Sequence, residues 1–457
     1  MIRFFLVLIL SFQACAPIRG FNAADPGSSD YWIHLLLQKI RFFRENEGNL
    51  EWTLLLGSSG LITSGMDTAV DAHGSIYVAG ETQGGIYNPS VTGITDLFIG
   101  KYDPQKNIIW GKQIGVSSAT IQVKGVAVDS IGSAYVTGSV DAPFFSSQLS
   151  SSDLFLVKYN PDGTQAWGRQ TGPSGSFVVT PSRIDVDIFG NSYIIGTSNG
   201  PFGGPASSGT NGFIIKFDTN GNQLWVRQNA ISGANYNSND VAFDRNTGSI
   251  YMTGFGNANF DTMTVPGIGN NDLFIVKFDT DGNRQFFAQL GFATRETQGH
   301  SLAVDGSGNI FAGGSSNGNF GSGADGSSTL GTLVKYSPSG VQQWVTQFGA
   351  PFGSGLITQI LAIGTDVGGN VFTTGTTQSN LVEGGSSIGS QDQFVIKHNS
   401  LGQVQWIRQT GVSSGSINGS GIQSDSEGNL YCVGTTNRNI NGVPVTGSSD
   451  LFLLKYR

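Results

Sequence analysis

The feature that most constrains this chain is one motif that recurs seven times along nearly its whole length. Each copy reads Asp-x-x-Gly, a segment like Tyr-Val-x-Gly, a variable loop, Asp-x-Phe-x-x-Lys-Tyr-Asp, a short turn and Trp-x-x-Gln. The lysine of the motif recurs about every 60 residues, at Lys101, Lys158, Lys216, Lys277, Lys335, Lys397 and Lys455. A period this regular indicates a repeat architecture in which each copy forms one structural unit.

Each copy contains four short runs in which apolar and polar residues alternate, which is the pattern of half-buried β-strands. In the first complete copy we expect strands over 66–71, 75–80, 96–103 and 108–115. Gly74 ends the Asp-x-x-Gly turn and can adopt the positive φ that a tight reversal requires. The sequence therefore predicts a four-stranded antiparallel meander.

The two ends of the chain are incomplete copies that complement each other. Trp52 matches the fourth run of the motif without the first three, and Leu451–Tyr456 is a third run without a fourth. We expect the N-terminal strand to complete the last unit as its outermost strand, because a closed ring leaves no exposed end. The predicted fold is all-β: a seven-bladed β-propeller of four-stranded antiparallel blades over residues 49–457, with a short N-terminal helix.

The segments 428–434 (Gly-Asn-Leu-Tyr-Cys-Val-Gly) and 450–456 (Asp-Leu-Phe-Leu-Leu-Lys-Tyr) resemble the SBBP family of bacterial β-propeller repeat proteins. The resemblance extends over about residues 49–457 and is carried by the recurring order of the motifs. It implies the propeller architecture and little about activity.

Composition and charge exclude some partners. The chain has a net charge of −8 and no run of Lys or Arg, whereas nucleic-acid binding requires a basic surface. The 67 glycines fall at turns and in loops between strands rich in Val, Ile and aromatic residues. We therefore expect a folded protein that binds no nucleic acid.

The N-terminus has the pattern of an export signal. Arg3 precedes an apolar stretch over 4–10, and Ser-Phe-Gln-Ala-Cys then ends at Cys15 like a lipoprotein cleavage site. This predicts a signal peptide over 1–14, a lipid on Cys15, and a location in the cell envelope at the outer membrane, on its periplasmic or its surface side. An ordinary secretory signal remains the alternative.

Residues 15–48 are expected to form a tether followed by an amphipathic helix over 30–46. Ile33, Leu36, Leu37 and Ile40 lie at helical spacing. The helix would lie on the membrane beside the anchor, or pack on the propeller; both remain open.

Catalytic and metal-binding patterns are weak. The Asp, Lys, Gln and Trp residues that recur in every copy are interpreted as scaffold. The segment Asp279–Asn283 lacks the Gly and Glu positions of an EF-hand loop. Only His300, near Arg295 and Glu296, falls in a loop expected at the mouth of the channel. We expect no metal, no cofactor and no assigned catalytic residue.

The candidate binding face is formed by the long loops between the second and third strands. These loops are rich in Gly, Ser, Thr and Asn, and we take their aromatic residues together with His300 as candidates for contact with a partner. The candidates are Tyr87, Phe144, Phe145, Phe202, Phe260, Phe320 and His300. The alternative is that the aromatic rings fold back and pin the loops.

These observations lead us to expect one of three functions. The first is a monomeric, lipid-anchored envelope protein that binds a protein or glycan through the variable-loop face. The second is an enzyme of lyase or hydrolase type with a site at the channel mouth. The third is a non-catalytic scaffold for envelope assembly. Propellers support many activities, so the fold alone does not decide between them.

Overall fold

The computed structural model describes residues 48–204, 209–229, 235–257, 269–318, 320, 327–349, 351, 353–382 and 388–457. The expected signal peptide, Cys15, the tether and the helix over 30–46 lie outside the described residues, as does Phe260. The compact unit Leu50–Arg457 is built from β-strands, and no helix occurs among its described residues. The all-β prediction is therefore confirmed for this part of the chain.

The strands are short and evenly spaced. Their bounds are β1 (Leu50–Leu56), β2 (Thr63–Val70), β3 (Ile76–Thr82), β4 (Asp96–Tyr102), β5 (Ile108–Ile114), β6 (Ile121–Val128), β7 (Ala134–Val140), β8 (Ser150–Tyr159), β9 (Gln165–Thr171), β10 (Gly175–Val186), β11 (Ser192–Ser198), β12 (Asn211–Phe217), β13 (Gln223–Asn229), β14 (Tyr236–Asp244), β15 (Ser249–Gly256), β16 (Asp272–Phe278), β17 (Arg284–Leu290), β18 (Thr297–Val304), β19 (Ile310–Ser316), β20 (Leu330–Tyr336), β21 (Gln342–Phe348), β22 (Thr358–Thr365), β23 (Val371–Thr377), β24 (Asp392–His398), β25 (Val404–Thr410), β26 (Ile417–Ser424), β27 (Leu430–Thr436) and β28 (Asp450–Tyr456).

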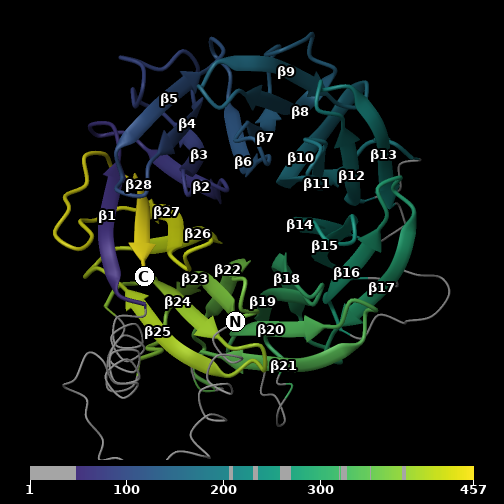
Figure 1. Ribbon diagram of the computed structural model, residues 1–457, viewed down its shortest axis with the longest axis vertical. Coiled ribbons are helices and arrows are strands. Elements are labelled where there is room, and N and C mark those ends of the chain that lie inside the picture. Colours follow the sequence, from purple (N-terminus) through teal and green to yellow (C-terminus); the bar gives the residue numbers. More distant parts are fainter. Residues whose placement is uncertain are drawn as a thin grey trace, which may run out of the picture. The chain divides into compact units, whose positions relative to one another are not determined.

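These strands form four-stranded antiparallel units. Five sheets have the orders β2-β3-β4-β5, β14-β15-β16-β17, β18-β19-β20-β21, β22-β23-β24-β25 and β1-β28-β27-β26. The remaining eight-stranded sheet contains the units β6–β9 and β10–β13, joined by a short parallel pairing of β8 with β10. The units are arranged around a common axis with the first strand of each innermost (Figure 1), which is the arrangement of a β-propeller.

The first strand in the chain lies beside the last. β1 pairs antiparallel with β28, with Trp52 opposite Lys455 and Leu54 opposite Leu453. The ammonium of Lys455 lies 2.8 Å from a carboxylate oxygen of Glu51. β1 thus supplies the fourth strand of the unit that otherwise contains β26, β27 and β28 (Figure 1).

The recurring Asp, Tyr and Lys residues form one network at the base of a unit. In the β2–β5 unit, the Tyr77 hydroxyl donates to Asp71 (3.1 Å) and to the carbonyl of Gly132 in the neighbouring unit (2.8 Å). Lys101 lies 3.4 Å from Asp71 and over the ring of Tyr77. The buried lysine is stabilised by a carboxylate and a π face at once. These motif residues therefore serve as scaffold.

The recurring Trp connects neighbouring units at their outer strands. The Trp110 indole N–H donates to the carbonyl of Pro161 in the β6–β9 unit at 3.0 Å. Gly163, in the same turn, has a φ of 81° and lies so close under the Trp110 ring that a Cβ there would be 2.7 Å from it. Glycine is thus required at this position by both backbone conformation and space.

Trp52 and Trp406 offer a matched test of this contact. The Trp52 indole donates to the carbonyl of Pro104 at 3.1 Å, whereas the Trp406 indole N–H has no hydrogen-bond partner among the described residues. Both rings pack on an aromatic side chain, with centroids 6.2 Å apart in each case.

We expect Trp52→Phe to lower the free energy of unfolding by about 1 kcal/mol more than Trp406→Phe, because only the former loses a hydrogen bond. Urea denaturation of the two variants measures the difference. Equal losses would contradict the assigned contact between β1 and the turn at Pro104.

Candidate functional site

The variable loops are held at their bases by the recurring Gln of the fourth strand. The Gln113 side-chain oxygen accepts the backbone N–H of Ile86 at 2.9 Å, and its amide donates to the carbonyl of Gly84 and to Asp96. Equivalent contacts are made by Gln170, Gln228, Gln347 and Gln409. A buried side chain with this many bonds fixes where each loop begins.

The aromatic candidates turn inward from these fixed loops. Phe202 is 5% exposed and packs edge-on against Phe213 at 4.9 Å. Phe144 packs in the same way on Phe155. A Cβ added at Gly168 would lie 2.1 Å from the ring of Phe145, which therefore covers the strand.

The remaining described candidates make similar inward contacts. The Tyr87 hydroxyl is hydrogen-bonded to the Tyr102 hydroxyl, and the Tyr87 ring packs on Phe98. Phe320 packs edge-on against Phe292 at 5.9 Å. The described rings thus anchor the loops, and their packing leaves little aromatic surface for a partner.

The variable-loop face presents aliphatic side chains instead. Leu61, Ile62, Ile94, Val382 and Ile388 have exposed fractions of 39% to 57%. They lie in the variable loops or in the connections between units, which end on the same side. The sequence analysis selected aromatic residues as candidates and did not include these aliphatic residues. A large aliphatic residue in a loop otherwise rich in Gly and Ser would have indicated them.

His300 lies in the innermost strand β18, where the pairing with β19 is interrupted by a bulge. Its Nε2 is 3.3 Å from the Ser315 hydroxyl and its ring packs edge-on against Phe255. Burial lowers the pKa of His300 to about 4, so the ring is neutral at neutral pH. Glu296 is exposed and accepts from Gln298. No described hydrogen bond or ion pair joins His300 to Arg295 or Glu296.

A polar cavity of about 470 Å³ lies on the axis of the propeller. It is lined by the C-terminal halves of the innermost strands and by the turns that follow them, including Arg245, Asn246 and Gly306. These turns lie at the opposite end of the strands from the variable loops, because the strands are antiparallel. The cavity therefore reaches the face that carries the Asp-x-x-Gly turns.

Arg183 of β10 forms the centre of the cavity floor. Its guanidinium donates to the carbonyls of Met66 (3.3 Å), Lys124 (3.0 Å) and Ser420 (2.7 Å) and lies 3.6 Å from the carboxylate of Asp67. The guanidinium charge is thus shared between a half-buried ion pair and the backbone of three other strands.

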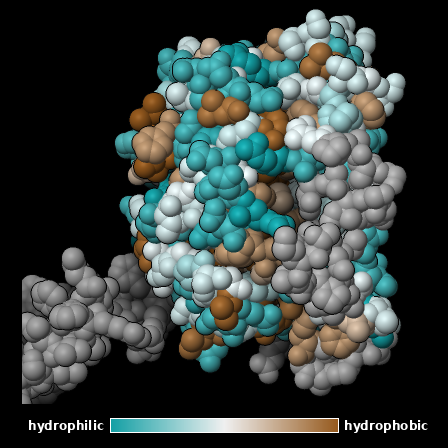
Figure 2. Space-filling view, turned by 90° about the vertical axis from the view of Figure 1, so that its right-hand side faces the viewer, coloured by the Kyte–Doolittle hydropathy of each residue, from teal (hydrophilic) through white to brown (hydrophobic). Residues whose placement is uncertain are grey.

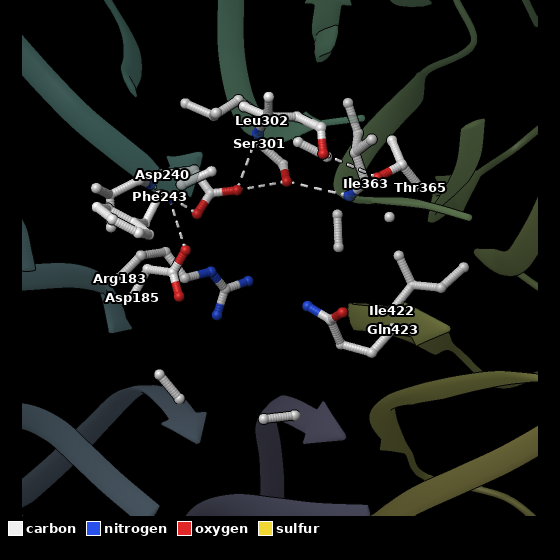
Figure 3. Close-up of a pocket in the computed structure, with 18 of the residues that line it drawn as sticks. Arg183, Asp185, Asp240, Phe243, Ser301, Leu302, Ile363, Thr365, Ile422 and Gln423 are labelled. Carbon is white, nitrogen blue, oxygen red and sulfur yellow. Dashed lines mark hydrogen bonds between the residues drawn. The ribbon is translucent and has the colours of Figure 1, made fainter. Parts of the chain in front are cut away.

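A second polar chain crosses the floor beside Arg183. The Ser301 hydroxyl donates to Asp240 at 2.6 Å, and the same hydroxyl oxygen accepts the backbone N–H of Ile363 at 3.0 Å. Figure 3 shows Arg183 and Gln423 reaching into the cavity from opposite sides, with Asp240 and Ser301 beside them. Polar groups from several units therefore converge on one space.

Burial shifts the acids of this cavity. It raises the pKa of Asp240 to about 6, although Arg183 and the Ser301 hydroxyl act in the opposite direction. Burial also raises the pKa of Asp67, against the attraction of Arg183, and that of Asp185. An acid that titrates near neutral pH can exchange a proton or pair with an incoming cation.

Sequence reasoning missed the cavity residues, although a signal was present. The residue four positions before the turn Asp differs from copy to copy, in contrast to the motif around it. The equivalent residues are Asp67, Gly125, Arg183, Asp240, Ser301, Ala362 and Gly421. When the first strands of the seven copies are aligned, this position holds a charged residue in three copies (Asp67, Arg183 and Asp240) and a small residue in the other four.

Comparison with known proteins agrees with this architecture. Residues 109–145, 166–203, 224–261, 285–321 and 405–441 match the family model SBBP, described as a β-propeller repeat. This chain carries the SBBP β-propeller repeat. Each match begins in the outer strand of one unit and extends past the second strand of the next, so the SBBP repeat is offset from the structural unit by one strand.

Other similar proteins are more distant. An uncharacterized WD repeat-containing protein of Acanthamoeba polyphaga mimivirus is 24% identical over 85% of this chain, which spans 36% of that relative's length. A chain solved in the mitotic checkpoint complex has a TM-score of 0.50 at 10% identity, with 97% of this chain and 98% of that one covered. A catalytically inactive virginiamycin B lyase from Staphylococcus aureus has a TM-score of 0.47 at 10% identity, with 89% and 99% covered.

The described part of the chain shows neither a metal site nor a membrane-spanning helix. Its described residues contain no group of three or more His, Cys, Asp or Glu side chains placed to hold a metal ion. Among the same residues, no helix has the length and apolar character needed to cross a membrane.

The raised pKa of Asp240 predicts a pH-dependent stability. Between pH 4 and pH 6 the folded state holds more protons on Asp240 than the unfolded state, so this residue's contribution to stability falls as pH rises. We expect the stability of the unmodified protein relative to Asp240→Asn to fall by on the order of 3 kcal/mol between pH 4 and pH 7. Urea denaturation of both proteins at several pH values measures this change.

Asp218→Asn is the control: desolvation is the largest single effect on this carboxylate and raises its pKa, but hydrogen bonds from Asn222 and backbone N–H groups together outweigh it and lower the pKa of Asp218. The stability of the unmodified protein relative to Asp218→Asn should rise, not fall, as pH increases through the acid range. A difference for Asp240→Asn that is constant with pH would contradict the assigned shift.

Proposed function

We propose that this protein is a non-catalytic binding protein of the cell envelope that presents the variable-loop face of a propeller to a protein or glycan partner. The observation that carries the proposal is the group of exposed aliphatic residues on loops whose bases are fixed. Exposed apolar side chains on a rigid support lose little conformational entropy on binding.

The proposal includes a closed ring of seven blades. Support comes from the pairing of β1 with β28 and from the division of the eight-stranded sheet into two antiparallel units. In addition, Arg183 bonds to carbonyls of β2, β6 and β26, so one side chain joins strands from the first two units and from the last unit of the chain. A closed ring would give every loop a fixed position relative to the others.

The variable-loop face suits a partner better than the outer wall. On the side shown in Figure 2, hydrophobic residues form separate patches among hydrophilic ones. On the variable-loop face, Leu61 and Ile62 follow one another and belong to the connection that meets the loop ending at Ser449. The structurally similar chain in the mitotic checkpoint complex belongs to a protein assembly, and binding to another protein is the role proposed here.

The envelope location rests on the N-terminal signal and on Cys15. A lipid there would keep the propeller at a membrane without a spanning segment. The outer membrane is the proposed site, and the side of the membrane depends on transport after lipidation.

An enzyme of lyase or hydrolase type is the second candidate. The specific observation in its favour is the polar cavity, in which Asp240 titrates near neutral pH and is hydrogen-bonded to Ser301. His300, the residue first considered for this role, is held by Ser315 and Phe255. Activity that survives Asp240→Asn unchanged would remove this candidate.

Lipidation can be tested with the two cysteines of the chain. We expect the full-length protein to incorporate labelled palmitate and to enter the detergent phase on phase separation, and Cys15→Ser to lose both properties. Cys432→Ser is the control, because Cys432 is buried and unpaired in β27. An unlabelled unmodified protein would indicate an ordinary secretory signal instead.

The binding face can be tested by replacing its exposed aliphatic residues. Partners recovered by cross-linking on intact cells, or glycans found on an array, should bind the combined variant Leu61→Ser, Ile62→Ser and Ile94→Ser about tenfold or more weakly. The matched control replaces Ile108 and Ile109, which are 51% and 52% exposed on the outer strand β5. Equal binding by the two variants would refute this face.

A further inference from the structure

Two adjacent turns on the face opposite the variable loops expose large apolar residues. Ile131 is 69% exposed in the turn after β6, and Ile188 and Phe189 are 50% and 74% exposed in the turn after β10. The two turns touch, since the Ser130 hydroxyl lies 3.5 Å from the carbonyl of Ile188. Turns of this kind ordinarily carry polar residues, so this apolar patch is not explained by the fold.

The apolar patch borders the central cavity. β6 and β10 line the cavity with Val128 and Asp185, and each strand continues directly into its exposed turn. A ligand that contacts Ile131, Ile188 and Phe189 can therefore place a group in the cavity without crossing another element.

The charge of the cavity defines which group it can accept. Its lining includes five carboxylates, those of Asp67, Asp185, Asp240, Asp244 and Asp305, and two guanidinium groups, those of Arg183 and Arg245. Arg183 is already neutralised by Asp67 and three carbonyls. Asp244 and Asp305 accept hydrogen bonds within their own turns. Asp185 and Asp240 remain, with Arg245 as the opposing charge, so the space above the floor has an excess of negative charge that an entering cation would offset.

We propose that the cavity and the apolar patch together form a second docking site, which takes a Lys or Arg side chain of a protein partner flanked by apolar residues. The basic side chain enters the cavity toward Asp185 and Asp240, and its apolar neighbours lie on Ile131, Ile188 and Phe189. A cavity of about 470 Å³ accommodates one such side chain with its hydration water. The site rests on the proposed binding role but does not involve the variable loops.

Selection from a random dodecapeptide phage library on the full-length protein in detergent tests the proposal. We expect the enriched peptides to contain Lys or Arg next to Leu, Ile, Val or Phe. Replacing that basic residue by Gln should weaken binding about tenfold or more. This peptide-side change needs no variant of the protein, so misfolding cannot produce the effect.

Variants of the protein then locate the contact. Asp185→Asn and Phe189→Ser should each weaken binding of the selected peptides about tenfold. Leu401→Ser is the matched control, because Leu401 is 69% exposed in a turn on the same face but near the outer strands. The combined Leu61, Ile62 and Ile94 variant should bind the peptides normally, which separates this site from the variable-loop face.

Three results would overturn the docking site. The first is a selection that yields no peptides or peptides without a basic residue. The second is unchanged binding by Asp185→Asn and Phe189→Ser. The third is binding of methylguanidinium alone, with no gain from flanking apolar residues and no dependence on Phe189, which would assign the cavity to a small cation.

Discussion

The backbone pairing of β1 with β28 is the contact on which the rest of the structure depends. Without β1, the unit containing β26, β27 and β28 would lack its outer strand, and no backbone pairing would join the two ends of the described chain. The pairing places Trp52 against the turn at Pro104 in the β2–β5 unit, so the N-terminal strand contacts the units at both ends of the chain.

The sequence was sufficient for the repeat, the strands and the partner of β1, because these depend on local alternation and on the fixed order of the motif. It was not sufficient to orient the loop aromatics. Phe202 and Phe144 could face solvent or the blade, and the choice is made by Gln228 and Gln170, which hold the loop backbone from a distant strand. Such a long-range hydrogen bond has no signature in the loop itself.

The candidate site shows the same division between repeated and unique residues. Repeated residues such as Asp71, Tyr77 and Lys101 bond to one another within the scaffold. Residues that differ between the copies occur in three places: the exposed aliphatic residues of the variable loops, the apolar turns after β6 and β10, and the inner strands that line the cavity. The blades differ in their inner strands as well as in their loops, and Arg183 and Asp240 occupy such a differing position of the inner strands.

The contacts of Arg183 also have a consequence for the order of folding. Its carbonyl acceptors are 59, 117 and 237 residues away along the chain. A vectorially synthesised chain therefore buries this guanidinium only after β26 has arrived, and until then the charge remains hydrated. The Arg183–Ser420 hydrogen bond can form only after the last repeat has been synthesised. A chain terminated before β26 would therefore keep the Arg183 guanidinium hydrated at the centre of the inner strands.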